Sequence, residues 1–171
     1  FWDEVEGGFF FVGKDHEALI VRSKNPYDNA IPSGNSVGTI ALLRLGALLG
    51  REDFREKAER TLKLFQPFMR EAPSGFGQMV CALDFFLERP VEVAIVGDVK
   101  AEETQALLTA VHKRWLPNRV LALCHPEGQA EAAEVIPLLS GKPQVAGRPT
   151  AYVCKDFTCS APVTEAGALD G

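Results

Sequence analysis

The chain has 171 residues, of which 46% are hydrophobic and 24% charged, and its formal net charge at pH 7 is -5. These values are typical of an ordinary soluble globular protein with one domain or two small ones. The negative charge argues against nucleic-acid binding, and no apolar run approaches the roughly 18 residues of a membrane span. We therefore expect neither a nucleic acid nor a membrane as a partner.

The first thirty residues combine aromatic residues with turn residues. Phe1 and Trp2 are typical of a core rather than of a free terminus, which indicates a fragment of a longer protein. Short apolar runs at residues 9–12 and 19–21 predict a β-hairpin or a pair of short extended pieces. Residues 25–29 have the composition of a loop.

Three helices are predicted next. A turn rich in capping residues, 32–36, precedes a helix over 36–49 that is apolar on nearly every side. The second helix, 52–70, has one apolar stripe and one charged face, and the third, which ends near residue 88, is again apolar all round. Alternation of buried and half-buried helices is typical of a layered α/α toroid. Because three helices are too few to close a ring, we expect only part of such a toroid.

After Pro90 the pattern changes to strands alternating with helices. Strands are predicted at 91–96, 120–124 and 151–154, with helices at 101–115 and 127–139 between them. This order predicts a small α/β subdomain with a three-stranded, largely parallel sheet and a loose tail after Pro162. The chain is therefore expected to be of mixed α and β class, with one domain over 1–89 and a second over 90–171.

An ordered set of short motifs resembles a known family. The motifs are Phe1-Trp2-Asp3-Glu4, Gly7-Gly8-Phe9-Phe10, Tyr27-Asp28, Ile31-Pro32-Ser33-Gly34-Asn35-Ser36, Pro73-Ser74-Gly75, Glu92-Val93-Ala94-Ile95-Val96-Gly97, Arg148-Pro149-Thr150-Ala151-Tyr152-Val153-Cys154 and Phe157-Thr158-Cys159. With these motifs the chain resembles, over nearly all its length, the C-terminal part of the spermatogenesis-associated protein 20 family, including its bacterial YyaL-like members. The resemblance implies a longer protein with an N-terminal thioredoxin-like domain and a six-hairpin toroid similar to that of N-acylglucosamine 2-epimerases. It implies no particular reaction.

The loops near the start of the first helix hold the candidate binding residues. They are Trp2, Asp3, Tyr27, Asp28, Ser33 and Asn35. Aromatic side chains can stack on sugar rings while Asp and Asn bond to hydroxyl groups, so the set predicts part of a carbohydrate-like pocket. The alternative is structural, with Ser33 or Asn35 capping the helix, Asp28 holding a turn and Trp2 packed in the core.

Acid/base chemistry has only weak candidates. Glycoside hydrolysis needs two carboxylates roughly 5–10 Å apart. The available acids are Asp3, Glu4, Asp28 and Asp84, of which Asp28 and Asp84 are the weak catalytic candidates. Asp84 interrupts an apolar helix, where a carboxylate must be paired or have a raised pKa, and Arg44 is a suitable partner. The two apolar helices contain no histidine. Epimerase chemistry by this chain alone is therefore not expected.

The cysteines give a second hypothesis. Cys81 and Cys124 lie in apolar runs and are expected to be buried, whereas Cys154 and Cys159 are separated by four residues and are redox candidates. Their spacing differs from that of a thioredoxin motif, and ligands for a zinc site are lacking. We expect no metal and no cofactor, and the unclustered cysteines favour a reducing, cytoplasmic location.

Three functions remain open at this stage. The first is a contribution to a carbohydrate-like pocket, with a sugar-like small molecule and the remainder of a longer chain as partners. The second is a redox-associated module that uses Cys154 and Cys159 with a thioredoxin-like domain outside this chain, and the third is structural completion of the toroid. Whether the protein is an enzyme is left open. Uncovered apolar faces predict that the isolated chain self-associates.

Overall fold

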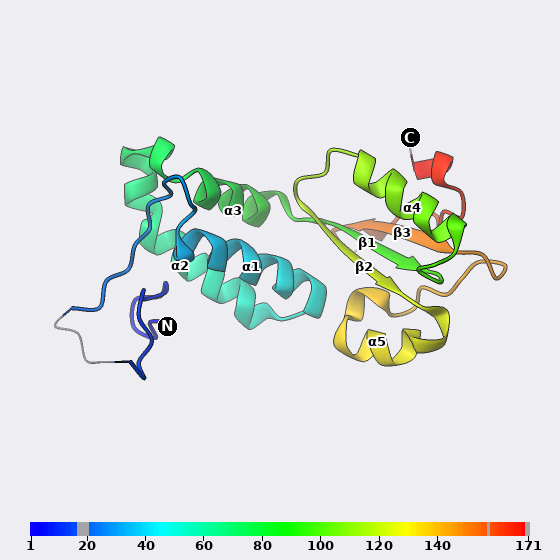
Figure 1. The fold of residues 1–171 in the computed structure, drawn as a ribbon, viewed down its shortest axis with the longest axis horizontal. Coiled ribbons are helices and arrows are strands. Elements are labelled where there is room, and N and C mark those ends of the chain that lie inside the picture. The colour runs from blue at the N-terminus through cyan, green and yellow to red at the C-terminus, as the bar shows by residue number, and fades with distance from the viewer. Residues whose placement is uncertain (17–20, 157, 170–171) are drawn as a thin grey trace. The chain divides into compact units, whose positions relative to one another are not determined.

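A computed structural model describes residues 1–16, 21–156 and 158–169. The chain divides into two compact units, the first formed by Phe1–Gly46 and Arg51–Glu88 and the second by Ala47–Gly50 and Arg89–Gly171. The first unit is helical and the second is built around a sheet (Figure 1). The predicted mixed α and β class is confirmed.

The N-terminal segment folds back on itself without forming the strand predicted at 9–12. Trp2 and Phe9 make an isolated antiparallel bridge, and the Phe10 amide donates to the Phe1 carbonyl at 2.8 Å. The turn uses Gly7 and Gly8, whose φ angles of 87° and 76° lie in the left-handed region. Residues 19 and 20 of the second predicted strand, and the phenylalanine of the last motif, lie outside the described residues.

The three helices of the first unit are confirmed to within two residues at their ends. They are α1 (Gly34–Leu49), α2 (Glu52–Glu71) and α3 (Gly77–Glu88). Gly50, with φ of 61°, lies directly after α1, as expected for a residue that ends a helix. The predicted apolar stripe of α2 consists of Phe54, Ala58, Leu62, Phe65 and Met69. The last four side chains are buried and Phe54 is partly buried.

Helices α1 and α3 are not buried on all sides in this chain. Val37 and Leu45 of α1 are 48% and 44% exposed, and Leu87 of α3 is 68% exposed. Their most buried positions include Leu43, Met79 and Phe85. The apolar composition predicted burial all round, but the described neighbours cover only one face of each helix.

The sheet of the second unit differs from the prediction. Four strands, β1 (Val91–Val96), β2 (Arg119–Cys124), β3 (Thr150–Lys155) and β4 (Thr158–Cys159), lie in the order β2-β1-β3-β4. Only β1 and β2 are parallel, since β3 is antiparallel to both β1 and β4. The expected three-stranded, largely parallel sheet is therefore wrong. The prediction failed because the composition of a segment indicates that it forms a strand but not in which direction that strand runs.

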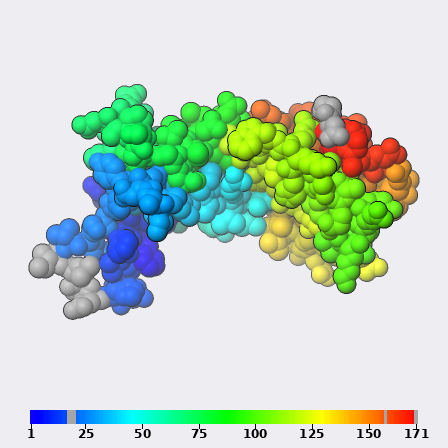
Figure 2. Space-filling view, turned by 45° about the horizontal axis from the view of Figure 1, so that its top comes forward, coloured from blue at the N-terminus to red at the C-terminus, as the bar shows by residue number. Residues whose placement is uncertain are grey.

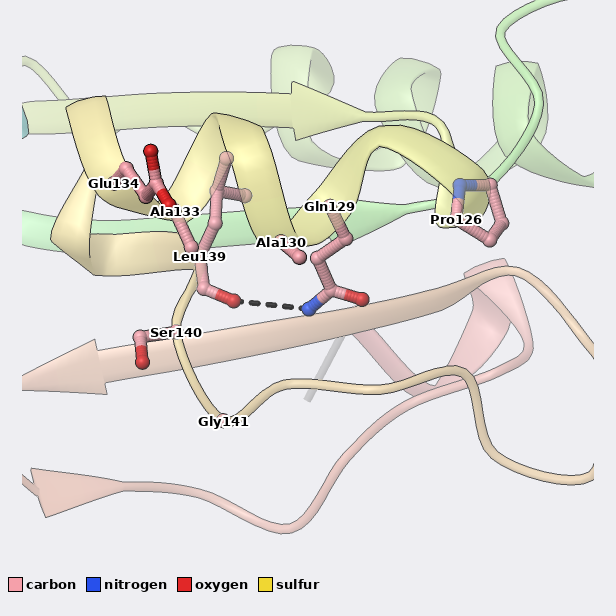
Figure 3. A pocket seen from close by; sticks show the side chains of 8 residues that line it. All are labelled: Pro126, Gln129, Ala130, Ala133, Glu134, Leu139, Ser140 and Gly141. Carbon is pink, nitrogen blue, oxygen red and sulfur yellow. Dashed lines mark hydrogen bonds between the residues drawn. The ribbon is translucent and has the colours of Figure 1, made fainter.

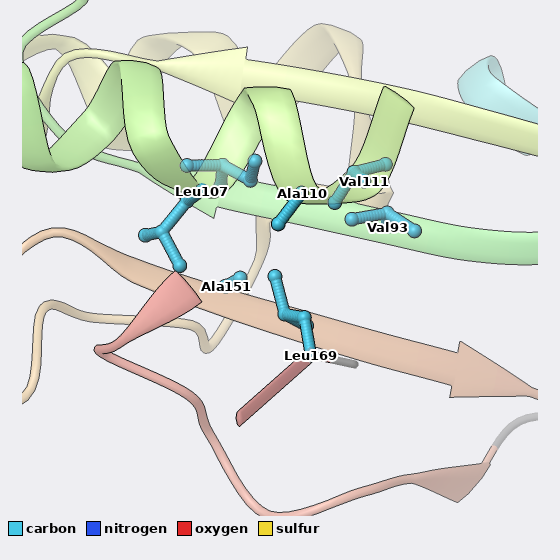
Figure 4. Close-up of a cluster of buried hydrophobic side chains, with 7 residues drawn as sticks. Val93, Leu107, Ala110, Val111, Ala151 and Leu169 are labelled. Atoms are coloured by element: carbon cyan, nitrogen blue, oxygen red, sulfur yellow. The ribbon is translucent and has the colours of Figure 1, made fainter. Parts of the chain in front are cut away.

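Helix α4 (Glu102–Lys113) connects the two parallel strands and covers one face of the sheet. Its Leu107, Ala110 and Val111 pack over the sheet near Ala151 and the C-terminal Leu169 (Figure 4). These side chains belong to a cluster of Val93, Ile95, Leu107, Ala110, Val111, Ala151 and Leu169. This cluster is the core on that side of the sheet.

The segment after Pro162 is not loose. Val163 exchanges two backbone hydrogen bonds with Ala151, at 2.8 and 2.9 Å. The short helix Ala166–Leu169 then contacts α4, and Figure 2 shows this red segment beside the yellow-green α4. Leu169 is only 4% exposed, so burial of this apolar side chain holds the segment in place. The composition of the segment alone did not predict this contact.

The predicted helix at 127–139 is shorter and broken. Helix α5 covers Gln129–Val135 and is flanked by 3-10 turns at Pro126–Gly128 and Pro137–Leu139. Pro137 lacks a backbone N–H, which explains why the α-helix does not continue through it. Among the described helices, none combines the length and apolar character needed to cross a membrane.

Candidate functional site

A cavity of about 540 Å³ lies in the first unit, where the N-terminal segment and the 25–32 loop meet the start of α1. Five aromatic residues and three asparagines contribute to its wall. The lining residues are Phe1, Phe9, Phe10, Phe11, Asn25, Tyr27, Asn29, Ile31, Pro32, Ser33, Gly34, Asn35 and Gly38. A concave, largely apolar wall with a few polar groups is the usual character of a small-molecule site.

Asn35 holds the two sides of this cavity together. It is 2% exposed, its Oδ1 accepts from the Phe9 amide at 2.7 Å, and its Nδ2 donates to the Phe9 and Asn25 carbonyls at 2.9 and 3.1 Å. An asparagine in the first turn of α1 thus fixes the backbone of both loops. Because its amide is occupied in this way, Asn35 shapes the cavity and is a poor hydrogen-bonding partner for a ligand.

Ser33 and Asp28 tie the same loops to two helix starts. Ser33 Oγ accepts from the Ser36 amide at 3.0 Å, which is an N-cap bond to α1. Asp28 Oδ1 accepts from the Ser33 amide at 2.8 Å, and its Oδ2 accepts from the Gln78 and Met79 amides at 2.8 and 3.2 Å. Asp28 therefore caps α3 while it orders the start of α1, and both carboxylate oxygens are engaged.

Trp2 and Asp3 are held by other contacts. The Trp2 ring packs edge-on against Phe9 with centroids 5.2 Å apart, and the Arg60 guanidinium lies 5.3 Å from the Trp2 ring centroid. Asp3 Oδ2 lies 2.6 Å from Lys24 Nζ, and its hydrogen bond to this ammonium lowers the pKa of the Asp3 carboxyl. Neither residue is among those that line the cavity.

Of the six predicted binding residues, Tyr27, Ser33 and Asn35 line the cavity, whereas Trp2, Asp3 and Asp28 lie outside its wall. Tyr27 is 44% exposed, and its ring packs against Phe76 with centroids 5.0 Å apart. The sequence pattern missed the phenylalanines at positions 1 and 9–11 as wall residues. The signal that could have identified them is the aromatic run itself. A half-buried strand alternates apolar with polar residues, and this run does not.

Asp84 lies in a different setting from the one expected. It is on the exposed side of α3, so the apolar surroundings that drew attention to it are absent. Arg44, the suggested partner, has its guanidinium 5.2 Å from the Phe85 ring centroid, and both Arg44 and Asp84 have further interactions. Nothing in this geometry places Asp84 at the cavity.

Cys154 and Cys159 form a disulfide in the second unit. They are opposite each other in the register of β3 and β4, which brings their side chains together on one face of the sheet. Cys154 is 3% exposed, whereas Cys159 is exposed. The other two cysteines were both expected to be buried. Cys124 is buried, but Cys81 is exposed on α3.

A second cavity, also of about 540 Å³, lies beside α5 in the second unit. Figure 3 shows Gln129 at its wall, where the side-chain amide donates to the Leu139 carbonyl at 2.9 Å. The same amide donates to the Lys142 carbonyl at 2.9 Å, so this polar group holds the following loop. Within the described residues no group of three or more His, Cys, Asp or Glu side chains is placed to hold a metal ion.

These features define a protein with a helical unit that carries an aromatic-lined cavity and an α/β unit that carries a disulfide hairpin. No family model matches the chain. It is 36% identical over 166 residues to spermatogenesis-associated protein 20 of Homo sapiens, 36% over 169 residues to that of Rattus norvegicus and 35% over 166 residues to that of Mus musculus. The chain is therefore homologous to spermatogenesis-associated protein 20, and it is consistent with a C-terminal part of that family. Each match covers 96% of this chain and 21% of the relative, so the chain spans about a fifth of their length.

Proposed function

We propose that the first unit contributes part of a pocket for a sugar-like small molecule. The observation that carries this proposal is the cavity wall, where Tyr27 and four phenylalanine rings surround a space of about 540 Å³. The apolar face of a sugar ring stacks on such aromatic side chains, and Asn25 and Asn29 supply amide groups at the same wall. In a longer chain, the three helices would belong to a toroid whose other helices cover their exposed faces.

The pocket is proposed to bind rather than to catalyse by itself. No aspartate or glutamate is among the described residues that line it, whereas glycoside hydrolysis needs a pair of carboxylates. Asp28, the nearest candidate in sequence, uses both oxygens to accept backbone N–H groups. Acid and base groups for any reaction would have to come from the remainder of the longer chain.

The test is a binding screen of the chain against monosaccharides and disaccharides by thermal shift, followed by calorimetry of any ligand found. Tyr27→Leu removes one wall ring and is expected to weaken binding about tenfold, the loss of one stacking contact. Asn29→Ala tests the polar part of the same wall.

Phe68→Leu is the matched control, because Phe68 is an aromatic residue of the first unit, is 43% exposed and lies outside the wall. It is expected to bind like the wild type. The proposal fails if no sugar raises the melting temperature, or if Tyr27→Leu and Phe68→Leu bind equally well.

A second candidate function is redox exchange at the Cys154–Cys159 disulfide. The disulfide itself favours it, because disulfides in a reducing cytoplasm, the location proposed for this protein, are usually transient and catalytic or redox-sensing. The exposed Cys159 gives a dithiol partner access to one sulfur, and a thioredoxin-like domain in the longer chain is the partner proposed. Thiol trapping after incubation with dithiothreitol tests it: a folded chain whose disulfide resists reduction at every dithiol concentration would exclude the function.

A further inference from the structure

Three residues on neighbouring strands form one row across the sheet. In the register of β1 and β3 Glu92 is opposite Cys154, and in the register of β3 and β4 Cys154 is opposite Cys159. Directly opposite residues of antiparallel strands point to the same face, with Cβ atoms about 4.5–5.5 Å apart. A carboxyl group therefore neighbours the disulfide on the side of its buried sulfur.

The burial of the two cysteines gives them different roles. Cys159 is exposed, whereas Cys154 is 3% exposed. We therefore expect an incoming thiolate to attack the sulfur of Cys159. When the bond opens, the sulfur of Cys154 becomes the leaving group. A buried thiolate is unfavourable, so its release is easier when a proton is delivered to it at once.

The surroundings of Glu92 favour its protonated form, the form that can deliver a proton. Burial raises the pKa of its carboxyl, and the positive charge of Lys142, from the segment after α5, acts in the opposite direction and lowers it. On β3 the next side chain of the same face is Tyr152, whose phenol pKa is also raised by burial. On β2 the opposite residue is the apolar Val120. The ion pair of Arg89 with Asp156 joins the segment before β1 to the residue after β3.

We propose that Glu92 is the proton donor and acceptor for Cys154 in dithiol–disulfide exchange, an inference that rests on the redox function proposed above. A thiolate of the dithiol attacks Cys159 Sγ, the bond between the two cysteine sulfurs breaks, and its electron pair goes to Cys154 Sγ, which takes the proton of the Glu92 carboxyl. The second thiol of the dithiol, once deprotonated, attacks its own mixed disulfide and releases Cys159 as thiolate. The dithiol is oxidised by two electrons and the Cys154–Cys159 pair is reduced.

In the reverse direction the Glu92 carboxylate accepts the proton of Cys154, and the resulting thiolate attacks a mixed disulfide on Cys159. The same carboxyl therefore serves both directions. Its protonation state must set the pH dependence of the exchange, over and above the ionisation of the dithiol itself.

The experiment uses the whole chain and measures the rate at which dithiothreitol reduces the Cys154–Cys159 disulfide between pH 5 and 9. Rapid alkylation followed by mass spectrometry gives the reduced fraction. Each rate constant is divided by the dithiothreitol thiolate concentration, which removes the ionisation of the reagent. For the wild type this normalised constant is expected to fall several-fold as pH rises and Glu92 loses its proton. For Glu92→Gln it is expected to be independent of pH and as low as the alkaline limit of the wild type.

Glu103→Gln is the matched control, since Glu103 is an exposed carboxylate on α4, which covers the opposite face of the sheet. It should reproduce the wild-type profile. Equal pH profiles for Glu92→Gln and the wild type would overturn the role of Glu92 and leave the redox function standing. A wild-type disulfide that dithiothreitol does not open would instead overturn the redox function itself. Circular dichroism of each variant verifies that the second unit stays folded.

Discussion

The strongest structural prediction concerns Asp28, because its carboxylate accepts three backbone N–H groups from two helix starts. Asp28→Ala removes the cap of α3, a loss of about 1 kcal/mol, and leaves the Ser33 amide without its partner, which costs about 1–3 kcal/mol more. We expect the first unit to lose about 3 kcal/mol of unfolding free energy. Asp28→Asn retains one acceptor oxygen and is expected to lose less.

The assay is urea unfolding followed by tryptophan fluorescence. The chain has two tryptophans, of which Trp2 belongs to the first unit and Trp115, 89% exposed, to the second. In a Trp115→Phe background the fluorescence therefore reports on the first unit alone. A loss below about 0.5 kcal/mol for Asp28→Ala would refute the capping argument, because changes of that size are ordinary for surface substitutions. Unchanged stability combined with lost ligand binding would show that Asp28 belongs to the site.

Three further predictions follow from the same contacts. Leu169→Ala should destabilise the second unit by about 2–3 kcal/mol in chemical unfolding, since it removes a core side chain that is 4% exposed; a cost near zero would mean that the C-terminal segment is not part of the core. The ion pair with Lys24 lowers the pKa of Asp3, so its stabilisation is present above the unfolded value of about 3.9 and is lost as pH falls below it. Unfolding free energies between pH 2.5 and 6 should therefore fall less steeply in Asp3→Asn than in the wild type, and parallel curves would contradict this. In sedimentation velocity the chain should self-associate as concentration rises, and a Val37→Glu, Leu45→Glu variant should associate less, because these side chains are 48% and 44% exposed; a wild type that stays monomeric would count against uncovered helix faces.

Local patterns were sufficient to predict most elements. The run of β-branched residues in Val91–Val96 predicts a strand with the bounds that β1 has, and four of its six residues are fully buried. The spacing of apolar residues in α2 and the glycine after α1 likewise predict real helix faces and ends. Such features depend on backbone propensity and burial within a single element, which the sequence of that element contains.

Features that depend on distant residues were not predictable in this way. The direction of β3 depends on how the preceding loop crosses the sheet, and β4 has only two residues, too few to show a pattern. The docked C-terminal segment depends on Leu169 meeting α4, a contact between positions more than fifty residues apart in sequence. Composition alone therefore described that segment as loose.

The candidate sites show the same division between residue type and residue role. Asp28, Ser33 and Asn35 were singled out because polar residues at a helix start suit both a cavity and a cap, and their hydrogen bonds are those of caps and loop ties. The side chains that remain to contact a ligand are mainly the aromatic ones, whose role in the wall appears only once the N-terminal segment has folded back. The same holds for Glu92. A glutamate in a strand does not by itself indicate a chemical role, and its position becomes informative only because β3 places Cys154 opposite it. The proposed proton donor for the disulfide therefore follows from the sheet register, and the pH profile of Glu92→Gln tests its role.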